Sequence, residues 1–323
     1  MYKLIGGTGR SGTTILSKIF ATHPEVADVP EWRFAVDPDG ILDCYSGLCG
    51  VWTPYLFDTK IKRLENLFLS VSRVSCLEKS LDRVDKLFCK RRGWRKLSPR
   101  YARTATTKIF PEFNFHAKAL IDDLAEFRAR CFWVGMSIGA ANEMRFGPIP
   151  ERNELTSVFR KFFLNVANEV NRYQGTKYYL EKNTWNILWF KQWQEILPDS
   201  KLVHIYRDPR DVVASYVKQT WMPSDPIQSA SVYRNLLRTW FRVREEVSES
   251  SYYEISLEEL VQQPEAVLEK ICSFWDIPMH SNLLKVDLNR SNSGRWRKEF
   301  PHETQRLLNE LLHDEILRLG YEI

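Results

Sequence analysis

The stretch KLIGGTGRSGTTILSKIF (residues 3–20) decides the fold. It begins with a short apolar run typical of a buried strand, and it ends with apolar residues at helical spacing. Between the two lies GTGRSGTT (residues 7–14), which is rich in glycine and hydroxyl side chains. The backbone amides of such a turn, together with the N-terminus of the helix that follows, form a site for an anion. The stretch therefore predicts a phosphate-binding turn between a first strand and a first helix.

Three templates fit this turn. As Gly-x-Gly-x-x-Gly it matches a dinucleotide fingerprint, with Asp28 and Glu31 about 20 residues further on. As Gly-x4-Gly it resembles a Walker A loop, but Thr13 stands where that loop has its lysine. The third template uses a cation inside the turn, Arg10, so that a guanidinium, two hydroxyls and the loop amides surround one terminal phosphate. The turn alone leaves the three templates open.

A second anion site follows the apolar stretch KLVHIY (residues 201–206). Arg207 falls at the carboxyl end of this predicted strand, where ligands of open α/β sheets collect. Ser215 lies on the predicted helix that comes next, and its hydroxyl is expected to face the same anion. An arginine fork with a hydroxyl suits a phosphate monoester. Two phosphate sites on one sheet fit a nucleotide phosphorylated at both ends, whereas NAD has no use for the second.

The rest of the chain alternates predicted strands with predicted helices. This alternation favours an α/β fold, with a P-loop-like central parallel sheet flanked by helices. No linker rich in Gly, Ser or Pro separates two domains, so we expect residues 1–323 to form a single domain with a helical insertion at roughly 35–175. The strands are expected at 2–6, 26–29, 177–180, 201–206 and 252–256, and the main helices at 13–22, 113–130, 154–173, 186–197, 210–219, 229–249, 264–275 and 302–319.

Composition narrows the class of protein. The 323 residues are 44% hydrophobic and carry a net charge of +5, which is typical of a globular chain. No run of ~18–20 apolar residues suggests a membrane span, and the N-terminus does not resemble a signal peptide, so we expect a cytoplasmic protein. The six cysteines and six histidines lack metal-ligand spacing, which predicts free thiols and no metal site.

The charge is unevenly distributed. Residues 60–108 hold 15 Lys and Arg against four acidic residues, a local net charge of +11. Such a concentration attracts a polyanion, an acidic peptide or a membrane surface, and it is equally typical of a solvated helical face. The sequence leaves both interpretations open.

The two anion motifs together resemble those of sulfotransferases that use 3′-phosphoadenosine 5′-phosphosulfate (PAPS). GTGRSGTT is similar to the 5′-phosphosulfate loop of that family, and YRDPRDVVASY (residues 206–216) is similar to its 3′-phosphate motif. EKNT (181–184) resembles the lysine-bearing loop, and SGRW (293–296) resembles the C-terminal part. The resemblance covers most of the chain except roughly 35–175.

Within the family, the spacing from Arg10 to Glu31-Trp32-Arg33 is closest to the tyrosylprotein sulfotransferase branch, in which a Glu-x-Arg holds the catalytic base. Two positions depart from that branch: Gln219 stands where it has another 3′-phosphate arginine, and Leu257 occupies an often aromatic position. Arg10 itself replaces the lysine usual in cytosolic sulfotransferases.

The resemblance implies a role for each matching residue. Without the resemblance, an exposed acid at the end of a strand is the better interpretation of Glu31. The implied roles are general base for Glu31; neutralisation of the bridging and sulfuryl oxygens for Arg10 and Lys182; the 5′-phosphate site for Ser11, Gly12, Thr13 and Thr14; the 3′-phosphate site for Arg207, Ser215 and, from the C-terminal loop, Arg295; and acceptor contacts for Trp32 and Arg33.

The implied reaction is in-line transfer of the sulfuryl group from PAPS to an acceptor hydroxyl without a metal ion. A tyrosyl, phenolic or other alcohol comes first as the acceptor, and a carbohydrate second. We expect an acidic peptide or an anionic glycan as partner and no nucleic acid. The alternatives are a non-catalytic nucleotide- or polyanion-binding protein and an NAD-dependent oxidoreductase. The aromatic residues after the expected base line either the acceptor site or the core: Trp32, Phe34, Trp52, Tyr55 and Phe57.

Overall fold

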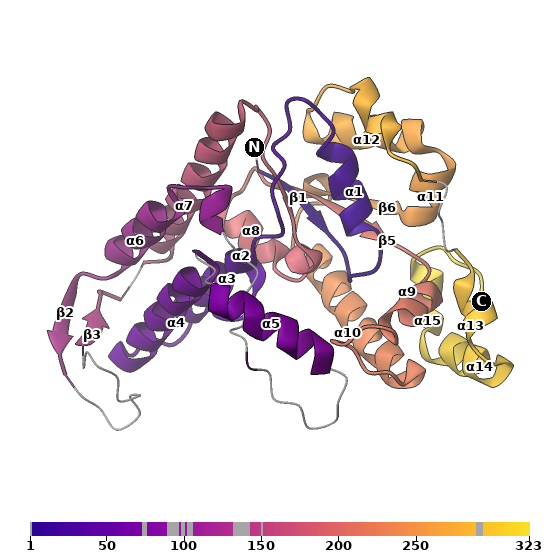
Figure 1. Ribbon diagram of the computed structural model, residues 1–323, viewed down its shortest axis with the longest axis horizontal. Coiled ribbons are helices and arrows are strands. Elements are labelled where there is room, and N and C mark those ends of the chain that lie inside the picture. The colour runs from indigo at the N-terminus through magenta and orange to yellow at the C-terminus, as the bar shows by residue number, and fades with distance from the viewer. Residues whose placement is uncertain are drawn as a thin grey trace. The chain divides into compact units, whose positions relative to one another are not determined.

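The computed structural model describes residues 2–72, 76–88, 97, 101, 106–131, 143–149, 151–288 and 293–323. The chain divides into two compact units (Figure 1). The sheet unit comprises Met1–Glu31, Gly175–Gln194 and Pro198–Ile323. The helical unit comprises Trp32–Gln174 and Glu195–Leu197. The single domain with an insertion at roughly 35–175 stays a prediction.

The sheet unit is built on four parallel strands in the order β4-β1-β5-β6. These strands are β1 (Lys3–Gly6), β4 (Leu180–Lys182), β5 (Lys201–Tyr206) and β6 (Tyr252–Ser256). All of β1 and the inner four residues of β5 are buried, as expected for strands covered on both faces. The predicted α/β fold with a central parallel sheet is confirmed. Because the strands are parallel, their carboxyl ends meet at one edge, where residues 7 and 207 begin the two predicted anion motifs.

Helices cover both faces of this sheet (Figure 1). On one face, α1, α11 and α12 form a hydrophobic core with β1, β5 and β6, in which the rings of Phe20 and Trp275 meet at 4.9 Å. On the other face, Trp240 of α10 packs on His204 of β5 at 5.1 Å. The helices of this unit are α1 (Thr13–Phe20), α9 (Pro209–Tyr216), α10 (Pro226–Glu245), α11 (Leu257–Gln262), α12 (Pro264–Trp275), α13 (Arg295–Glu299), α14 (His302–Leu311) and α15 (His313–Arg318), with 3-10 turns at Thr184–Ile187, Glu249–Ser251 and Ser281–Lys285.

The helical unit has an aromatic core. Phe68 stacks on Phe162 at 5.7 Å, and Phe34 meets the ring of Phe113 at 5.2 Å. Helix α8 (Phe190–Ile196) begins in the sheet unit and ends in this one. The elements of the unit are α2 (Arg33–Val36), α3 (Ile41–Leu48), α4 (Pro54–Ser72), α5 (Cys76–Phe88), α6 (Phe113–Leu124) and α7 (Arg152–Gln174), a 3-10 turn at Thr106–Lys108, and the antiparallel strands β2 (Phe127–Arg130) and β3 (Glu143–Phe146).

Several predicted elements differ from the structure. The helix predicted over 113–130 ends at Leu124, and Phe127–Arg130 is a strand because its backbone pairs with Glu143–Phe146. The strand predicted over 26–29 is only an isolated bridge between Val26 and Tyr178. The strand predicted over 177–180 lies later, at Leu180–Lys182. The helices predicted over 186–197 and 302–319 are each divided, the first by a leading 3-10 turn and the second at Leu312.

Part of the basic segment at 60–108 is described. Four of its cations form ion pairs within the helical unit: Lys60 with Asp43, Lys62 with Asp58, Arg63 with Asp39 and Lys86 with Asp82. These four pairs favour the solvated-face interpretation for their part of the segment. The basic residues Arg73, Lys90, Arg91, Arg92, Arg95, Lys96, Arg100 and Arg103 lie outside the described residues. Within the described ranges, no helix combines the length and the apolarity that a membrane crossing requires.

Candidate active site

The turn after β1 has a backbone that favours glycine at two positions. Gly9 and Gly12 have φ angles of 89° and 114°, and Arg10 between them has a φ of 60°. A Cβ on Gly12 would lie 2.8 Å from Cδ1 of Ile205, so no side chain fits there without a shift. Gly12 also precedes α1 and offers no side-chain cap. Ile15 donates its N–H to the Gly12 carbonyl, so within the described residues the N–H groups of Thr13 and Thr14 remain for an anion.

The predicted cofactor residues surround one cavity of about 260 Å³ in the sheet unit. Its lining includes seven of the eight: Arg10, Gly12, Thr13, Thr14, Arg207, Ser215 and Arg295. The eighth, Ser11, does not line the cavity but is fully buried directly beside it in the chain, and its Oγ has no hydrogen-bond partner in the described part of the chain. Apolar side chains and one acid complete the wall: Ile15, Leu257, Val261, Leu288 and Asp287.

Arg10 and Ser215 connect the two motifs directly. Arg10 Nε donates a hydrogen bond of 2.8 Å to Ser215 Oγ. Ser215 is held on buried α9, whereas Arg10 is exposed. The guanidinium is thus held at the edge of the cavity by a residue of the second anion motif. The two motifs therefore form one site.

Asp211 is a site residue that the sequence analysis missed. Arg207 Nη2 lies 3.3 Å from Oδ2 of this buried carboxylate. The same carboxylate accepts backbone N–H bonds from Gly294 at 2.7 Å and from Trp296 at 3.1 Å. Burial raises the pKa of Asp211, while the Arg207 charge and the two N–H groups act in the opposite direction. Asp211 therefore ties Arg207 to the segment that presents Arg295. Its place four residues after Arg207 is compatible with an ion pair, but the sequence does not show that Asp211 is buried.

Arg210 was also missed, and its role is structural. Its side chain is 2% exposed and lies over the ring of Trp296, with the guanidinium carbon 4.2 Å from the ring centroid. It donates to Asp208 in a paired arrangement and to Oδ1 of Asn309 at 3.0 Å. These contacts hold α13 and α14 against α9, and Arg295 is the first residue of α13.

Two of the predicted catalytic residues form an ion pair. Lys182 Nζ lies 2.6 Å from Oε2 of Glu31, with the lysine and glutamate side chains 12% and 22% exposed. Lys182 sits at the end of β4 beside Ile5 of β1. The turn is anchored to the same strand end, because Gly7 donates its N–H to the Thr184 carbonyl at 2.9 Å. Neither Glu31 nor Lys182 lines the 260 Å³ cavity.

The predicted acceptor residues lie in the helical unit. Trp32 is fully buried, and its ring meets that of Phe34 at 5.3 Å. Phe34 and Phe57 are buried as well, so these three aromatic residues belong to the core and not to an exposed wall; Tyr55 is 44% exposed. Arg33 starts α2, and its Nη1 lies 3.6 Å from Oδ1 of Asp37.

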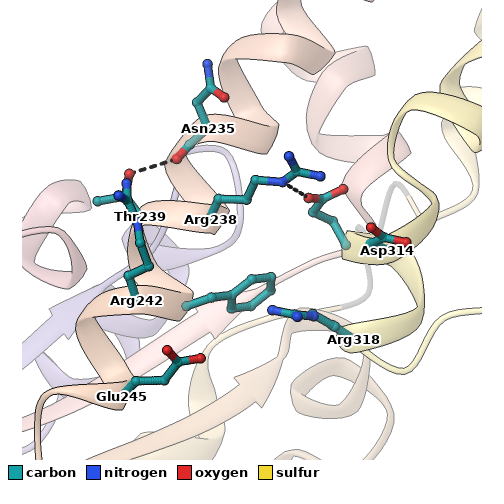
Figure 2. A pocket seen from close by; sticks show the side chains of 9 residues that line it. Asn235, Arg238, Thr239, Arg242, Glu245, Asp314 and Arg318 are labelled. Atoms are coloured by element: carbon teal, nitrogen blue, oxygen red, sulfur yellow. Dashed lines mark hydrogen bonds and ion pairs between the residues drawn. The ribbon is translucent and has the colours of Figure 1, made fainter.

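A larger cavity, of about 530 Å³, lies elsewhere in the sheet unit, between α10 and α15 (Figure 2). There Arg238 Nε donates to the buried Glu315 at 2.6 Å, and Arg318 lies against the ring of Phe241. None of the residues predicted from the sequence lines this cavity. The candidate active site is therefore the smaller cavity, where the two anion motifs meet.

Comparison with known proteins agrees with this geometry. A family model described as "Sulfotransferase family" matches residues 64–281, more than half of the chain. The chain belongs to the sulfotransferase family. The matched region contains Lys182, Arg207 and Ser215, whereas Arg10 and Glu31 precede it.

Two solved structures are similar over the full length of this chain. The sulfotransferase domain of the Synechococcus PCC 7002 olefin synthase has a TM-score of 0.51 and 16% identity, and the match covers 100% of this chain and 95% of that one. The sulfotransferase domain from the curacin biosynthetic pathway has a TM-score of 0.49 and 15% identity, with 100% and 98% covered. At these identities the likeness concerns the fold alone. The search of curated proteins found no match.

Proposed function

We propose that this sulfotransferase moves the sulfuryl group from PAPS to an acceptor hydroxyl, with Glu31 as the base. The observation that carries the proposal is the single cavity shared by Arg10, Arg207, Ser215 and Arg295. A nucleotide with phosphates at both ends needs two anion positions within one site. NAD, the rival ligand, has no terminal phosphate monoester for an arginine and hydroxyl pair.

The residues present fit such a donor. Three guanidinium groups, those of Arg10, Arg207 and Arg295, border the cavity, and the uncapped first turn of α1 adds backbone N–H donors. Ser11 Oγ, buried without a partner in the described residues, is a further donor at the turn. When bound, PAPS supplies an activated sulfuryl group at its 5′ end. The structure's own contribution is to hold that end against fixed cations and amides, which stabilises charge without a metal ion.

The chain's own residues divide the remaining work. Glu31 accepts the proton of the acceptor hydroxyl. Lys182, 2.6 Å from Glu31, holds that carboxylate in place and adds a positive charge at the strand edge next to the turn. Arg10, fixed by Ser215, neutralises oxygens at the 5′ end of the donor. The anchoring of Gly7 to Thr184 keeps the turn and the lysine at the same edge of the sheet.

For the acceptor we propose a tyrosyl or other phenolic hydroxyl, with a carbohydrate hydroxyl second. The support is the spacing of Glu31 and Arg33, which resembles the tyrosylprotein sulfotransferase branch. The surplus of basic residues between 60 and 108 suits an acidic peptide or an anionic glycan as the molecule that carries this hydroxyl.

Two measurements test the proposal. Labelled PAPS is incubated with phenols, acidic tyrosine peptides, sugars and lipid alcohols, and the wild type is expected to transfer the label to at least one of them. The turnover of Glu31→Gln is expected to be lower by about 100-fold or more at saturating PAPS. Near-normal turnover of Glu31→Gln would show that Glu31 is not the base.

In a thermal-shift titration, 3′-phosphoadenosine 5′-phosphate is expected to raise the melting temperature, whereas NAD is not. The reverse result supports the oxidoreductase. Binding without any transfer supports the non-catalytic alternative.

A further inference from the structure

A buried carboxyl lies directly next to the Glu31–Lys182 pair. Glu181 precedes Lys182 on β4, and its side chain is 0% exposed. Tyr2, the residue before β1, donates its hydroxyl to Oε2 of Glu181 at 2.7 Å. The other oxygen, Oε1, has no hydrogen-bond partner in the described part of the chain. Neither the core nor the proposed reaction explains an acid at this position.

The surroundings of Glu181 disfavour a negative charge. Within the described residues its carboxyl forms no ion pair. The titratable groups that face it are Tyr2, which precedes β1, Tyr179 through its contact with Tyr2, and Glu31 from the segment after α1. Burial raises the pKa of Glu181 to about 8; the Tyr2 hydrogen bond lowers it, and the charge of Glu31 raises it. Burial and the nearby Glu181 also raise the pKa of Tyr2, so the phenol stays a donor. At neutral pH the pair Tyr2–Glu181 is therefore uncharged.

Adjacent residues of a strand point to opposite faces of the sheet, so the side chains of Glu181 and Lys182 lie on opposite faces, and that of Glu181 is buried in the sheet unit. Glu181 is fully buried and adjoins Lys182 in the chain, so its charge lies in low-dielectric surroundings close to the Glu31–Lys182 pair. With Glu181 protonated, the local charges of Glu31 and Lys182 cancel. With Glu181 ionised, the strand end that carries the Glu31–Lys182 pair gains one net negative charge.

We propose that Glu181 is a positioning residue of this sulfotransferase: through its charge state it governs the electrostatic balance of the Glu31–Lys182 pair toward the anionic donor. The inference rests on the proposed function of that pair. It assigns the Tyr2–Glu181 hydrogen bond a role in the reaction, in addition to its part in the core.

The pH profile of transfer provides the first test. In the wild type, kcat/KM for the donor is expected to fall by about fivefold as pH rises through about 8, because ionised Glu181 repels the donor. Glu181→Gln, which stays neutral, is expected to lose this alkaline limb. Tyr2→Phe removes the bond that favours the ionised form, so its alkaline limb is expected to move to higher pH. If Glu181 only fills the core, neither substitution changes the alkaline limb of the pH profile.

Thermal unfolding tests the charge state without any activity. Unfolded Glu181 ionises above its ordinary pKa of 4.5, whereas the folded carboxyl keeps its proton up to about 8. Stability is therefore lost as pH rises between these values, and the loss is complete above about 8. The melting temperature of Glu181→Gln minus that of the wild type is expected to grow from pH 5 to pH 8 and then to stay level. Binding of 3′-phosphoadenosine 5′-phosphate, followed in the same scans, shows that the variants retain the site.

The outcomes separate the inference from the proposed function. Transfer by the wild type, with an unchanged pH profile in both variants, overturns the role of Glu181 and leaves the proposed function intact. A melting-temperature difference that does not change with pH also overturns it, because Glu181 is then ionised in the fold. Absence of any transfer by the wild type overturns both, since Glu181 then has no reaction to serve.

Discussion

Arg10 Nε and Ser215 Oγ lie 2.8 Å apart although 205 residues separate them in the chain. The contact exists because β1 and β5 are neighbouring parallel strands, so the turn after one and the helix after the other share an edge of the sheet. One hydroxyl thereby fixes the guanidinium that faces the 5′ end of the proposed donor and also lines the proposed 3′-phosphate position.

Removal of this hydroxyl is expected to weaken donor binding. Ser215→Ala loses the bond to Arg10 and one donor toward the 3′-phosphate, so the affinity for 3′-phosphoadenosine 5′-phosphate should fall by about tenfold. Isothermal titration measures it. Ser231→Ala is the matched control, because the Ser231 hydroxyl donates to the Ile227 carbonyl within α10 and Ser231 does not line the cavity. Equal affinities of Ser215→Ala and Ser231→Ala would argue against a ligand contact by Ser215.

The turn itself is testable through its glycine. Gly12→Ala places a methyl group 2.8 Å from Ile205 Cδ1 at a φ of 114°, so it should both destabilise the fold by more than about 1 kcal/mol and abolish nucleotide binding. Gly175 provides the control, because its φ of 69° is also positive but no atom lies within 4 Å of an added Cβ. Gly175→Ala is expected to lower stability by about 1 kcal/mol and to leave binding unchanged. Urea unfolding and nucleotide titration of both variants distinguish the two effects.

Asp211 should determine how well Arg295 is presented. In Asp211→Asn one of the two oxygens that accept the N–H groups of Gly294 and Trp296 becomes an NH₂ group, and a donor then faces a donor. We expect Asp211→Asn to lower the free energy of unfolding by about 1–3 kcal/mol. It should also weaken nucleotide binding, and Arg295→Ala should weaken binding for the same reason. Asp314→Asn, at an exposed position on α15, serves as the control. If the double variant Asp211→Asn/Arg295→Ala loses binding as the sum of the single losses, the two residues act independently.

The sequence predicted the parts of the fold that local pattern determines. The strands at 201–206 and 252–256 and the helix at 264–275 lie at the predicted residues, because a continuous apolar stretch or a proline-started amphipathic helix is a local signal. The local pattern predicts a helix at 127–130, but these residues form a strand because they pair with residues 143–146. Pairing over such a distance leaves no local trace.

The candidate site likewise has residues that the sequence predicts and residues that it does not. That the two anion motifs share one cavity could be predicted because each follows a strand of one parallel sheet, and parallel strands bring their carboxyl ends together. Asp211 and Glu181 were missed because nothing in a single sequence separates a buried acid from a solvated one. Both acids are buried by contacts with other parts of the chain, Asp211 with the 294–296 segment and Glu181 with Tyr2.

The hydrogen-bonded pair of His204 and Glu254 predicts how the fold responds to acid. Glu254 Oε1 lies 2.8 Å from His204 Nδ1 and accepts from Trp240 Nε1 at 2.8 Å, while Arg244 donates to Oε2. Burial raises the pKa of Glu254, but the contacts of His204, Trp240 and Arg244 outweigh it and lower the pKa to about 2.

Because the folded pKa lies below the ordinary value of 4.5, the stabilisation by Glu254 is complete above pH 4.5 and is lost as pH falls toward 2. Its size is roughly 3 kcal/mol. Glu254→Gln should therefore lower the free energy of unfolding by about that amount at pH 7, and the difference from the wild type should shrink steadily between pH 4.5 and pH 2. Urea unfolding at pH 7, 4 and 3 measures it, with exposed Glu249→Gln as the control. A difference that stays constant down to pH 3 would mean that Glu254 titrates in the folded protein as it does in the unfolded chain.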